Sequence, residues 1–178
     1  GFSHLKVALS VGVQKMVRAD QAGAGVMFTI DTETGFPDIL LIDASWGLGE
    51  SVVKGMVTPD EYRVFKPLLA EPAVVPIVRK QLGTKRSKII GAANGSAVRT
   101  AETSAVERSR LVLTDEQILQ LARWGVDIER HYGRPMDIEW AIDGDSGLLY
   151  ILQARPETVE SRKLASALDL EERLRLPG

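Results

Sequence analysis

The sequence predicts an α+β domain whose sheet is mostly antiparallel and is flanked by helices. Three observations lead to this class. Short apolar stretches separated by tight turns dominate the first half of the 178 residues. Only one long segment, 114–132, has apolar residues near helical spacing. It is followed by two alternating stretches that are joined by a glycine-containing turn, which is the pattern of a β-hairpin. Strands with few helices between them are typical of α+β domains.

In the first half, short stretches that alternate or are continuously apolar predict strands at 11–17, 26–30, 39–42, 61–66 and 88–92. The glycine-rich residues 23–25 are expected to interrupt the chain before the second of these strands. Residues 34–38, with the sequence TGFPD, form a turn cluster. The continuous apolar run at 39–42 is typical of a well-buried strand.

The long helix has clear start and stop signals. Thr114 is followed three residues later by Gln117, a capping box in which each side chain satisfies a free amide of the other residue. Asp115 suits the positive end of the helix dipole. Gly133 and Pro135 end the helix.

The predicted hairpin pairs residues 136–142 with residues 148–154. With its turn centred near Ser146, Glu139 lies opposite Gln153 and Asp137 lies opposite Arg155. One face then carries Asp137, Glu139, Ala141, Ile151, Gln153 and Arg155, and the other carries Ile138, Trp140, Ile142, Tyr150, Leu152 and Ala154. The second face is apolar and must pack on a core. A slip of one residue in the turn would move one strand's side chains to the other face.

Two interpretations of the polar face follow. On the pattern alone, a solvated surface with an ordinary cross-strand salt bridge is favoured. The same groups also suit a magnesium–phosphate site, because Mg²⁺ prefers a few carboxylate or amide oxygens together with water and substrate phosphates. Glu139 and Gln153 would supply oxygens, and Arg155 would hold a phosphoryl oxygen. Asp137 would either add a metal ligand or orient the arginine.

Composition excludes several other kinds of site. The chain has no cysteine and only two histidines, which rules out thiolate zinc sites, iron–sulfur clusters and histidine-rich metal sites. A net charge of −2 argues against general nucleic-acid binding, and no apolar run approaches the length of a membrane span. Neither GxxxxGK[ST] nor GxGxxG occurs. The amides of SWGLGE at 45–50 could cradle a phosphate, but an ordinary strand-to-helix turn is favoured there.

Four segments in order resemble a known family: VQKMV at 13–17, GVMFT at 25–29, SWGLGE at 45–50 through TPDE at 58–61, and GRPMDIEW at 133–140 through QARPET at 153–158. They are similar to the phosphoenolpyruvate synthases (pyruvate, water dikinases), in the C-terminal half of the ATP-grasp nucleotide-binding domain. The resemblance covers roughly residues 1–162. It implies a partial ATP-grasp subdomain at 1–158 and a linker at 159–178 toward a phosphohistidine domain.

The resemblance also implies chemistry and site residues. Members of that family convert ATP, pyruvate and water to AMP, phosphoenolpyruvate and phosphate, with Mg²⁺ and a phosphohistidine on a swivelling domain. By position, adenine would lie against Gln14, Lys15, Met16 and Val17, Glu50 would lie near the nucleotide, Asp137 would lie at the phosphates, Glu139 and Gln153 would be the magnesium ligands, and Arg155 would be the catalytic contact to the phosphates. The resemblance thereby shifts the interpretation of the polar face from solvated surface to functional site.

Several parts of such an enzyme do not occur in this sequence. The first ATP-grasp lobe with its phosphate-binding lysine and arginine, the swivelling phosphohistidine domain and the pyruvate-binding barrel are therefore the expected partners, within one polypeptide. The chain begins without Met and ends at Pro177-Gly178, so we expect it to be a piece of a longer protein. A homodimer is compatible with the resemblance, and a cytoplasmic location is expected. The alternatives are the ATP-grasp part of a rifampicin-type antibiotic phosphotransferase and a non-catalytic nucleotide-binding module.

Overall fold

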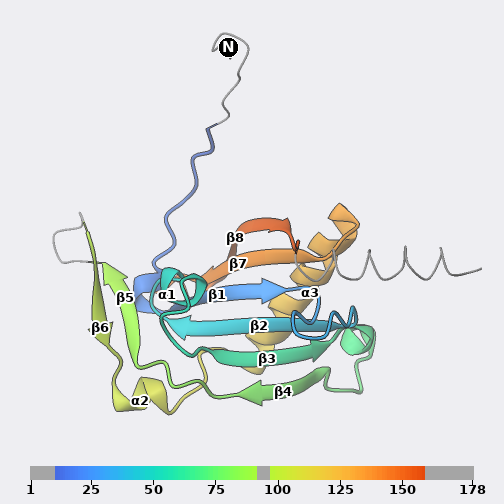
Figure 1. Cartoon of the computed structure of the whole chain (residues 1–178), viewed down its shortest axis with the longest axis horizontal. Coiled ribbons are helices and arrows are strands. Elements are labelled where there is room, and N and C mark those ends of the chain that lie inside the picture. The colour runs from blue at the N-terminus through green and yellow to red at the C-terminus, as the bar shows by residue number, and fades with distance from the viewer. Residues whose placement is uncertain (1–10, 92–96, 159–178) are drawn as a thin grey trace, which may run out of the picture.

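The computed structural model describes residues 11–91 and 97–158, and it confirms the α+β class. A six-stranded sheet with the order β4-β3-β2-β1-β7-β8 forms the body, and β5 and β6 form a separate two-stranded ribbon beside it (Figure 1). All of these pairings are antiparallel. The strands are β1 Gly23–Phe28, β2 Ile39–Trp46, β3 Asp60–Phe65, β4 Ile77–Gln81, β5 Ser87–Gly91, β6 Val98–Glu102, β7 Met136–Ile142 and β8 Leu149–Pro156. The helices are α1 Glu50–Val53, α2 Ala105–Arg108 and α3 Asp115–Tyr132, with 3-10 turns η2 Ala19–Gln21 and η3 Lys66–Ala70.

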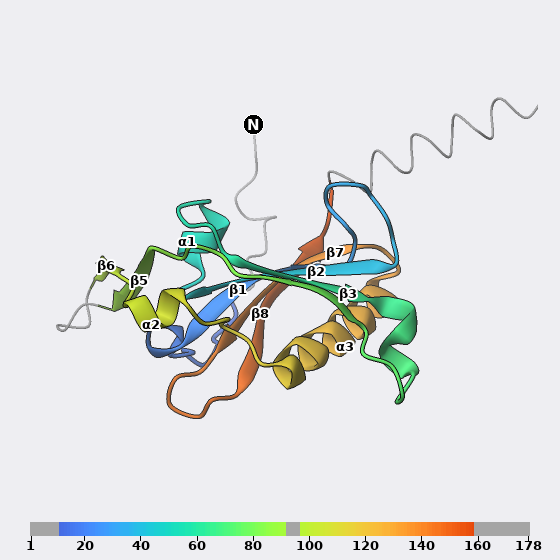
Figure 2. The same cartoon turned by 90° about the horizontal axis from the view of Figure 1, so that it is seen from below.

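Helix α3 crosses one face of the sheet and builds the main core against it, whereas α1 lies on the other side (Figure 2). Ile118, Leu121 and Ala122 of α3 are fully buried against sheet residues such as Ile42 and Trp140. The predicted capping box between Thr114 and Gln117 is confirmed, and Gly133 ends the helix in the left-handed conformation with φ 65°. None of the helices in the described ranges is long and apolar enough to cross a membrane.

The opposite face of the sheet is covered only in part. A small apolar cluster of Val17, Ala19, Ala24 and Ala141 lies at one end of it. Beyond this cluster the face carries the polar side chains of the hairpin. Helix α1 lies on this same side of the sheet (Figure 2). The side of the sheet away from α3 is therefore the open face of this domain.

Residues 23–25 do not interrupt the chain, contrary to the prediction, because they begin β1. A Cβ atom on Gly25 would lie 1.8 Å from the carbonyl oxygen of Asp43 and 2.8 Å from the Trp140 ring. Glycine is needed there for close packing within the sheet and not for a turn. The buried strand predicted at 39–42 is confirmed and continues to Trp46 as β2.

The prediction of a strand at 11–17 is wrong, because this segment pairs with no strand in the structure. Strand β8 is an edge of the sheet, but the segment reaches it only through a side-chain contact of 3.5 Å between Lys15 and Tyr150, without backbone pairing. Residues 11–16 run outward from the sheet (Figure 1), and the chain is anchored from Val17 on, which is buried, and at Arg18, whose backbone N–H donates to Asp143 at 3.2 Å.

The hairpin is confirmed, but the predicted faces are correct only for part of it. Glu139 pairs with Gln153 and Asp137 pairs with Arg155, as expected. A β-bulge follows, so Trp140 pairs with Ile151. The extra residue moves Ile151 to the core side, and Tyr150 and Leu152 pack against the small cluster on the open face.

Candidate functional site

The Asp137–Arg155 pair forms the first polar row of the open face. The Arg155 Nε atom donates to Asp137 Oδ2 at 2.8 Å, and an Arg155 terminal nitrogen lies 2.7 Å from the same oxygen. The carboxylate side chain is 14% exposed and the arginine side chain is 57% exposed. The other carboxylate oxygen, Asp137 Oδ1, is buried without a hydrogen-bond partner among the described residues. An orphaned buried oxygen beside an accessible guanidinium is typical of a site that a ligand completes.

The second polar row is Glu139 opposite Gln153 on the same two strands. Glu139 is half-buried and Gln153 is exposed. In the described part of the chain, neither side chain takes part in a hydrogen bond or ion pair. Directly opposed residues of an antiparallel pair have Cβ atoms roughly 5 Å apart, so their oxygens can share one cation.

The oxygens of Glu139 and Gln153 fit Mg²⁺ better than they fit a metal whose ligands all come from the protein. One carboxylate and one amide oxygen are hard ligands, which Mg²⁺ prefers, and Mg²⁺ usually completes its shell with water and phosphate oxygens. Within residues 11–91 and 97–158 there is no group of three or more His, Cys, Asp or Glu side chains that could hold a metal. A cation at Glu139 and Gln153 would therefore need oxygens from a ligand.

A cavity of about 280 Å³ opens beside the first row, and Glu139 and Gln153 of the second row do not line it. Asp137 and Arg155 form one side of it, and Asp43 of β2 also lines it. The remaining lining is apolar or glycine: Val26, Phe28, Val52, Val53, Gly55, Val57 and Pro59. The cavity thus combines a cationic group and two carboxyl groups with a partly apolar wall.

The sequence prediction missed Asp43 as a site residue. Burial and the neighbouring Glu61 carboxylate raise the pKa of Asp43 to about 6, and the Arg63 guanidinium opposes this shift. The signal in the sequence was an acid within an apolar stretch. Once the strand is extended to Trp46, alternation places Asp43 with Leu41 on the face opposite the core residue Ile42.

The segment predicted to contact adenine is not brought to this cavity. None of Gln14, Lys15, Met16 and Val17 lines it. The Lys15 Nζ atom lies 5.4 Å from the Tyr150 ring centre and 3.7 Å from an Asp143 oxygen. Met16 is 79% exposed, whereas Val17 is buried in the small cluster.

Glu50 also stands apart from the cavity. It is exposed at the start of α1 and pairs with Lys54 at 2.5 Å. The glycines before it serve the strand-to-helix turn, as favoured from the sequence. Gly47 has φ 83°, and the amides of Gly47 and Leu48 donate to the carbonyl oxygens of Ala22 and Ile89. These two amides are therefore not available for a phosphate.

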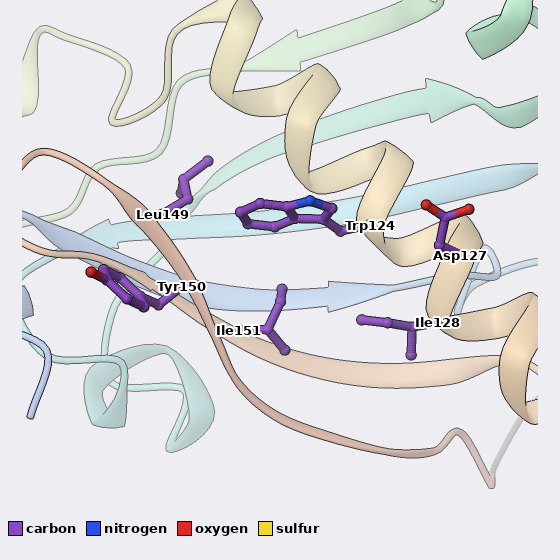
Figure 3. Close-up of a pocket in the computed structure, with 6 residues that line it drawn as sticks. All are labelled: Trp124, Asp127, Ile128, Leu149, Tyr150 and Ile151. Carbon is purple, nitrogen blue, oxygen red and sulfur yellow. The ribbon is translucent and has the colours of Figure 1, made fainter. Parts of the chain in front are cut away.

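A second cavity, of about 440 Å³, lies between α3 and β8 (Figure 3). Trp124 and Ile128 of the helix face Leu149 and Ile151 of the strand across it (Figure 3). Because its lining is almost entirely apolar, this cavity lacks the groups that would bind a phosphate or a metal.

Comparison with known proteins shows the family to which the chain belongs. Residues 1–175 match the family described as the pyruvate phosphate dikinase AMP/ATP-binding domain. The chain is 56% identical to the phosphoenolpyruvate synthase of Helicobacter pylori over 171 residues, which are 92% of this chain and 21% of that protein. It is 55% identical to the phosphoenolpyruvate synthase of Synechocystis over 175 residues, 94% of this chain and 21% of that protein. For the Escherichia coli phosphoenolpyruvate synthase the identity is 52% over 167 residues, 91% of this chain and 21% of that protein.

The chain spans about a fifth of the length of these relatives, so it corresponds to one part of a longer polypeptide. The family match covers almost all of the chain, and the identities exceed 50% over nine-tenths of it. The chain therefore belongs to the family of pyruvate phosphate dikinase AMP/ATP-binding domains.

Proposed function

We propose that this chain is the ATP- and magnesium-binding lobe of a dikinase that makes phosphoenolpyruvate from pyruvate, ATP and water through a phosphohistidine on another domain. The observation that carries the proposal is the pair of polar rows, Asp137–Arg155 and Glu139–Gln153, side by side on the open face. Membership of an AMP/ATP-binding family supports the nucleotide. The name shared by the relatives described above supports pyruvate rather than an antibiotic as the final acceptor.

The domain is the second lobe of an ATP-grasp clamp. Its open face is a partly covered antiparallel sheet with a metal-ligand pair, which suits a nucleotide held between this face and another lobe. The first lobe, the phosphohistidine domain and the pyruvate-binding barrel would come from the rest of the polypeptide. Gln14, Lys15, Met16 and Val17 would contact adenine in that assembly, and Glu50 would lie near the nucleotide.

The residues of the two rows have separate tasks. Arg155 binds a phosphoryl oxygen and stabilises the charge that builds up on it during transfer. Asp137 fixes the guanidinium through the two contacts at 2.8 and 2.7 Å, at the side of the cavity that both residues line. Glu139 and Gln153 would hold the Mg²⁺, whose positive charge would offset the negative charge of the phosphate oxygens.

Substitution of Glu139→Gln and Arg155→Ala in the full-length enzyme tests this assignment. Each variant should lose the ATP-dependent phosphorylation of the enzyme and keep the wild-type circular dichroism spectrum. The measurement is phosphohistidine formed from ATP labelled at the β-phosphate. Glu71→Gln is the matched control, because Glu71 is exposed outside the site and does not line the cavity. Wild-type phosphohistidine in both site variants would refute the assigned roles.

A further inference from the structure

We propose that Asp43 binds a phosphoryl oxygen of the nucleotide as a neutral carboxylic acid, and that nucleotide binding therefore takes up one proton. The inference rests on the function proposed above and adds a ligand-contacting residue to that site. It starts from the cavity, which Asp43 lines together with Asp137 and Arg155.

The sheet register places Asp43 in line with the predicted metal ligands. Asp43 on β2 pairs with Val26 on β1, Val26 pairs with Glu139 on β7, and Glu139 pairs with Gln153 on β8. Neighbouring strands are ~4.8 Å apart, so the backbones at Asp43 and Glu139 are separated by about 10 Å. A polyphosphate chain can bridge such a gap while one end stays at the metal-ligand row. Asp43 is thus within reach of phosphate oxygens that Glu139 does not contact.

The charged groups around Asp43 leave it without a cation of its own. Arg63 on β3 is occupied by three carboxylates, with contacts of 3.1 Å to Asp31, 2.8 Å to Glu33 and 2.9 Å to Glu61. Across the cavity, Arg155 on β8 is paired with Asp137 on β7.

The other neighbours of Asp43 are apolar or negative. The paired residue on β1 is Val26, and α1 contributes Val52 and Val53 to the cavity. The remaining charged side chains of this face are the carboxylates Glu61 on β3 and Glu139 on β7, and Arg79 on β4, which lies 4.0 Å from Glu61. In the described chain the Asp43 carboxyl has no hydrogen-bond partner.

These surroundings decide the protonation state that a phosphate would meet. Burial and Glu61 already raise the pKa of Asp43 to about 6. A phosphate beside it adds negative charge, which favours the neutral acid further. A neutral carboxylic acid can donate its O–H to a phosphoryl oxygen, and a hydrogen bond to a charged acceptor is among the stronger ones. An ionised Asp43 would instead repel the same oxygen.

The proton linkage can be counted by calorimetry. The full-length enzyme is titrated at pH 7 with β,γ-methylene ATP in excess Mg²⁺, in two buffers whose ionisation enthalpies differ. A group with pKa near 6 is about nine-tenths ionised at pH 7, so up to ~0.9 proton should be taken up per site. The sign follows from the raised pKa in the complex: affinity falls as pH rises above 6.

Three variants separate the possible results. Asp43→Asn keeps an N–H donor and should bind the analogue with little loss but without the proton uptake. Asp43→Ala has no donor and should bind about five- to tenfold more weakly. Glu71→Gln, an exposed acid outside the cavity, should retain the wild-type proton count.

Binding of the analogue by wild-type enzyme without proton uptake would overturn the role of Asp43 and leave the proposed function intact. The same proton uptake in wild type and Asp43→Asn would also overturn it. If Asp43→Asn raised the Mg²⁺ concentration needed for binding and left the proton count unchanged, Asp43 would be a metal ligand instead. No binding of the analogue at all by wild type would count against the proposed function itself.

Discussion

Lys85 is the least expected side chain in the structure, because a lysine is rarely completely buried. It has no exposed side-chain area, pairs with the equally buried Asp60, and adopts a positive φ of 39°. Asp60 also accepts hydrogen bonds of 2.8 Å from the backbone N–H groups of Gly83 and Val112. The Lys85 amide donates to Thr58 at 3.1 Å. The pair therefore ties the segment before β3, which carries the cavity residues Val57 and Pro59, to two distant loops.

Replacement of Lys85 should lower the free energy of unfolding. Lys85→Met leaves a buried carboxylate without its cation, and breaking a buried ion pair in this way costs about 3–5 kcal/mol. Urea unfolding of this chain measures the loss. Lys80→Met is the matched control, because Lys80 pairs with Asp115 at 2.9 Å on the surface and its loss should cost less than about 1 kcal/mol. Equal losses of unfolding free energy in Lys85→Met and Lys80→Met would contradict the conclusion that burial makes the Lys85–Asp60 pair important.

Asp43 should also make stability depend on pH. Its folded pKa of about 6 lies above the ordinary value of 3.8, so the folded state binds the proton more tightly than the unfolded state does. The contribution of Asp43 to the free energy of unfolding is therefore largest below pH 4 and falls as pH rises from 4 to 6. Relative to wild type, Asp43→Asn should gain up to about 3 kcal/mol across that window. Urea unfolding at pH 4, 5, 6 and 7 checks this, and parallel curves for the two proteins would be inconsistent with the raised pKa.

At the scale of elements, α3 and the hairpin were predictable because their signals are local. The capping box, the left-handed Gly133 and the opposition of Glu139 to Gln153 all follow from residues close in the sequence. Strands β4 and β6 were missed because their residues are almost all exposed or half-buried, so they carry no alternating apolar pattern.

The bulge in the hairpin could not be predicted for a different reason. Residues 148–152 are apolar throughout, so either register buries apolar side chains on both sides of β8. Only the small cluster around Val17 and Ala24, which comes from distant parts of the chain, selects the observed arrangement of Tyr150 and Leu152. The bulge does not affect the predicted pairing of Glu139 with Gln153, because both residues lie on the side of the bulge away from the turn.

The start of α3 allows a prediction for a single element. Thr114 accepts a hydrogen bond from the Gln117 amide at 3.3 Å, and the Gln117 side chain accepts one from the Thr114 amide at 3.0 Å. Thr114→Ala should lower the free energy of unfolding by about 1 kcal/mol, since a donor at the first turn loses its partner. Thr114→Ser, which keeps the hydroxyl, should stay close to wild type in the same urea experiment. A comparable loss in the serine variant would show that the methyl group, not the cap, is responsible.

At the scale of the whole molecule, the sequence predicts the arrangement of the hairpin residues better than that of the segment at 14–17. The rows of the hairpin are formed within this sheet, so local alternation was enough to place them. The segment at 14–17 pairs with no strand, although Lys15 lies beside the edge strand β8, and its Met16 is exposed. Its contact with adenine stays a prediction, because none of these four residues lines the cavity.

Because this chain would supply only part of the proposed site, its activity in isolation can be predicted. Phosphoryl transfer depends on positioning and on charge stabilisation from several sides, and the cavity of this chain is lined by one arginine, Arg155, next to the proposed metal-ligand pair. The isolated 178 residues should therefore show no turnover of ATP with pyruvate, even where the full-length enzyme is active under the same conditions. Phosphoenolpyruvate formation, followed by phosphorus NMR at matched concentrations, is the measurement. Addition of the remaining polypeptide as a separate chain should restore part of the activity if the lobes reassociate. Turnover by the isolated chain would mean that one lobe suffices and that the clamp interpretation of the open face is wrong.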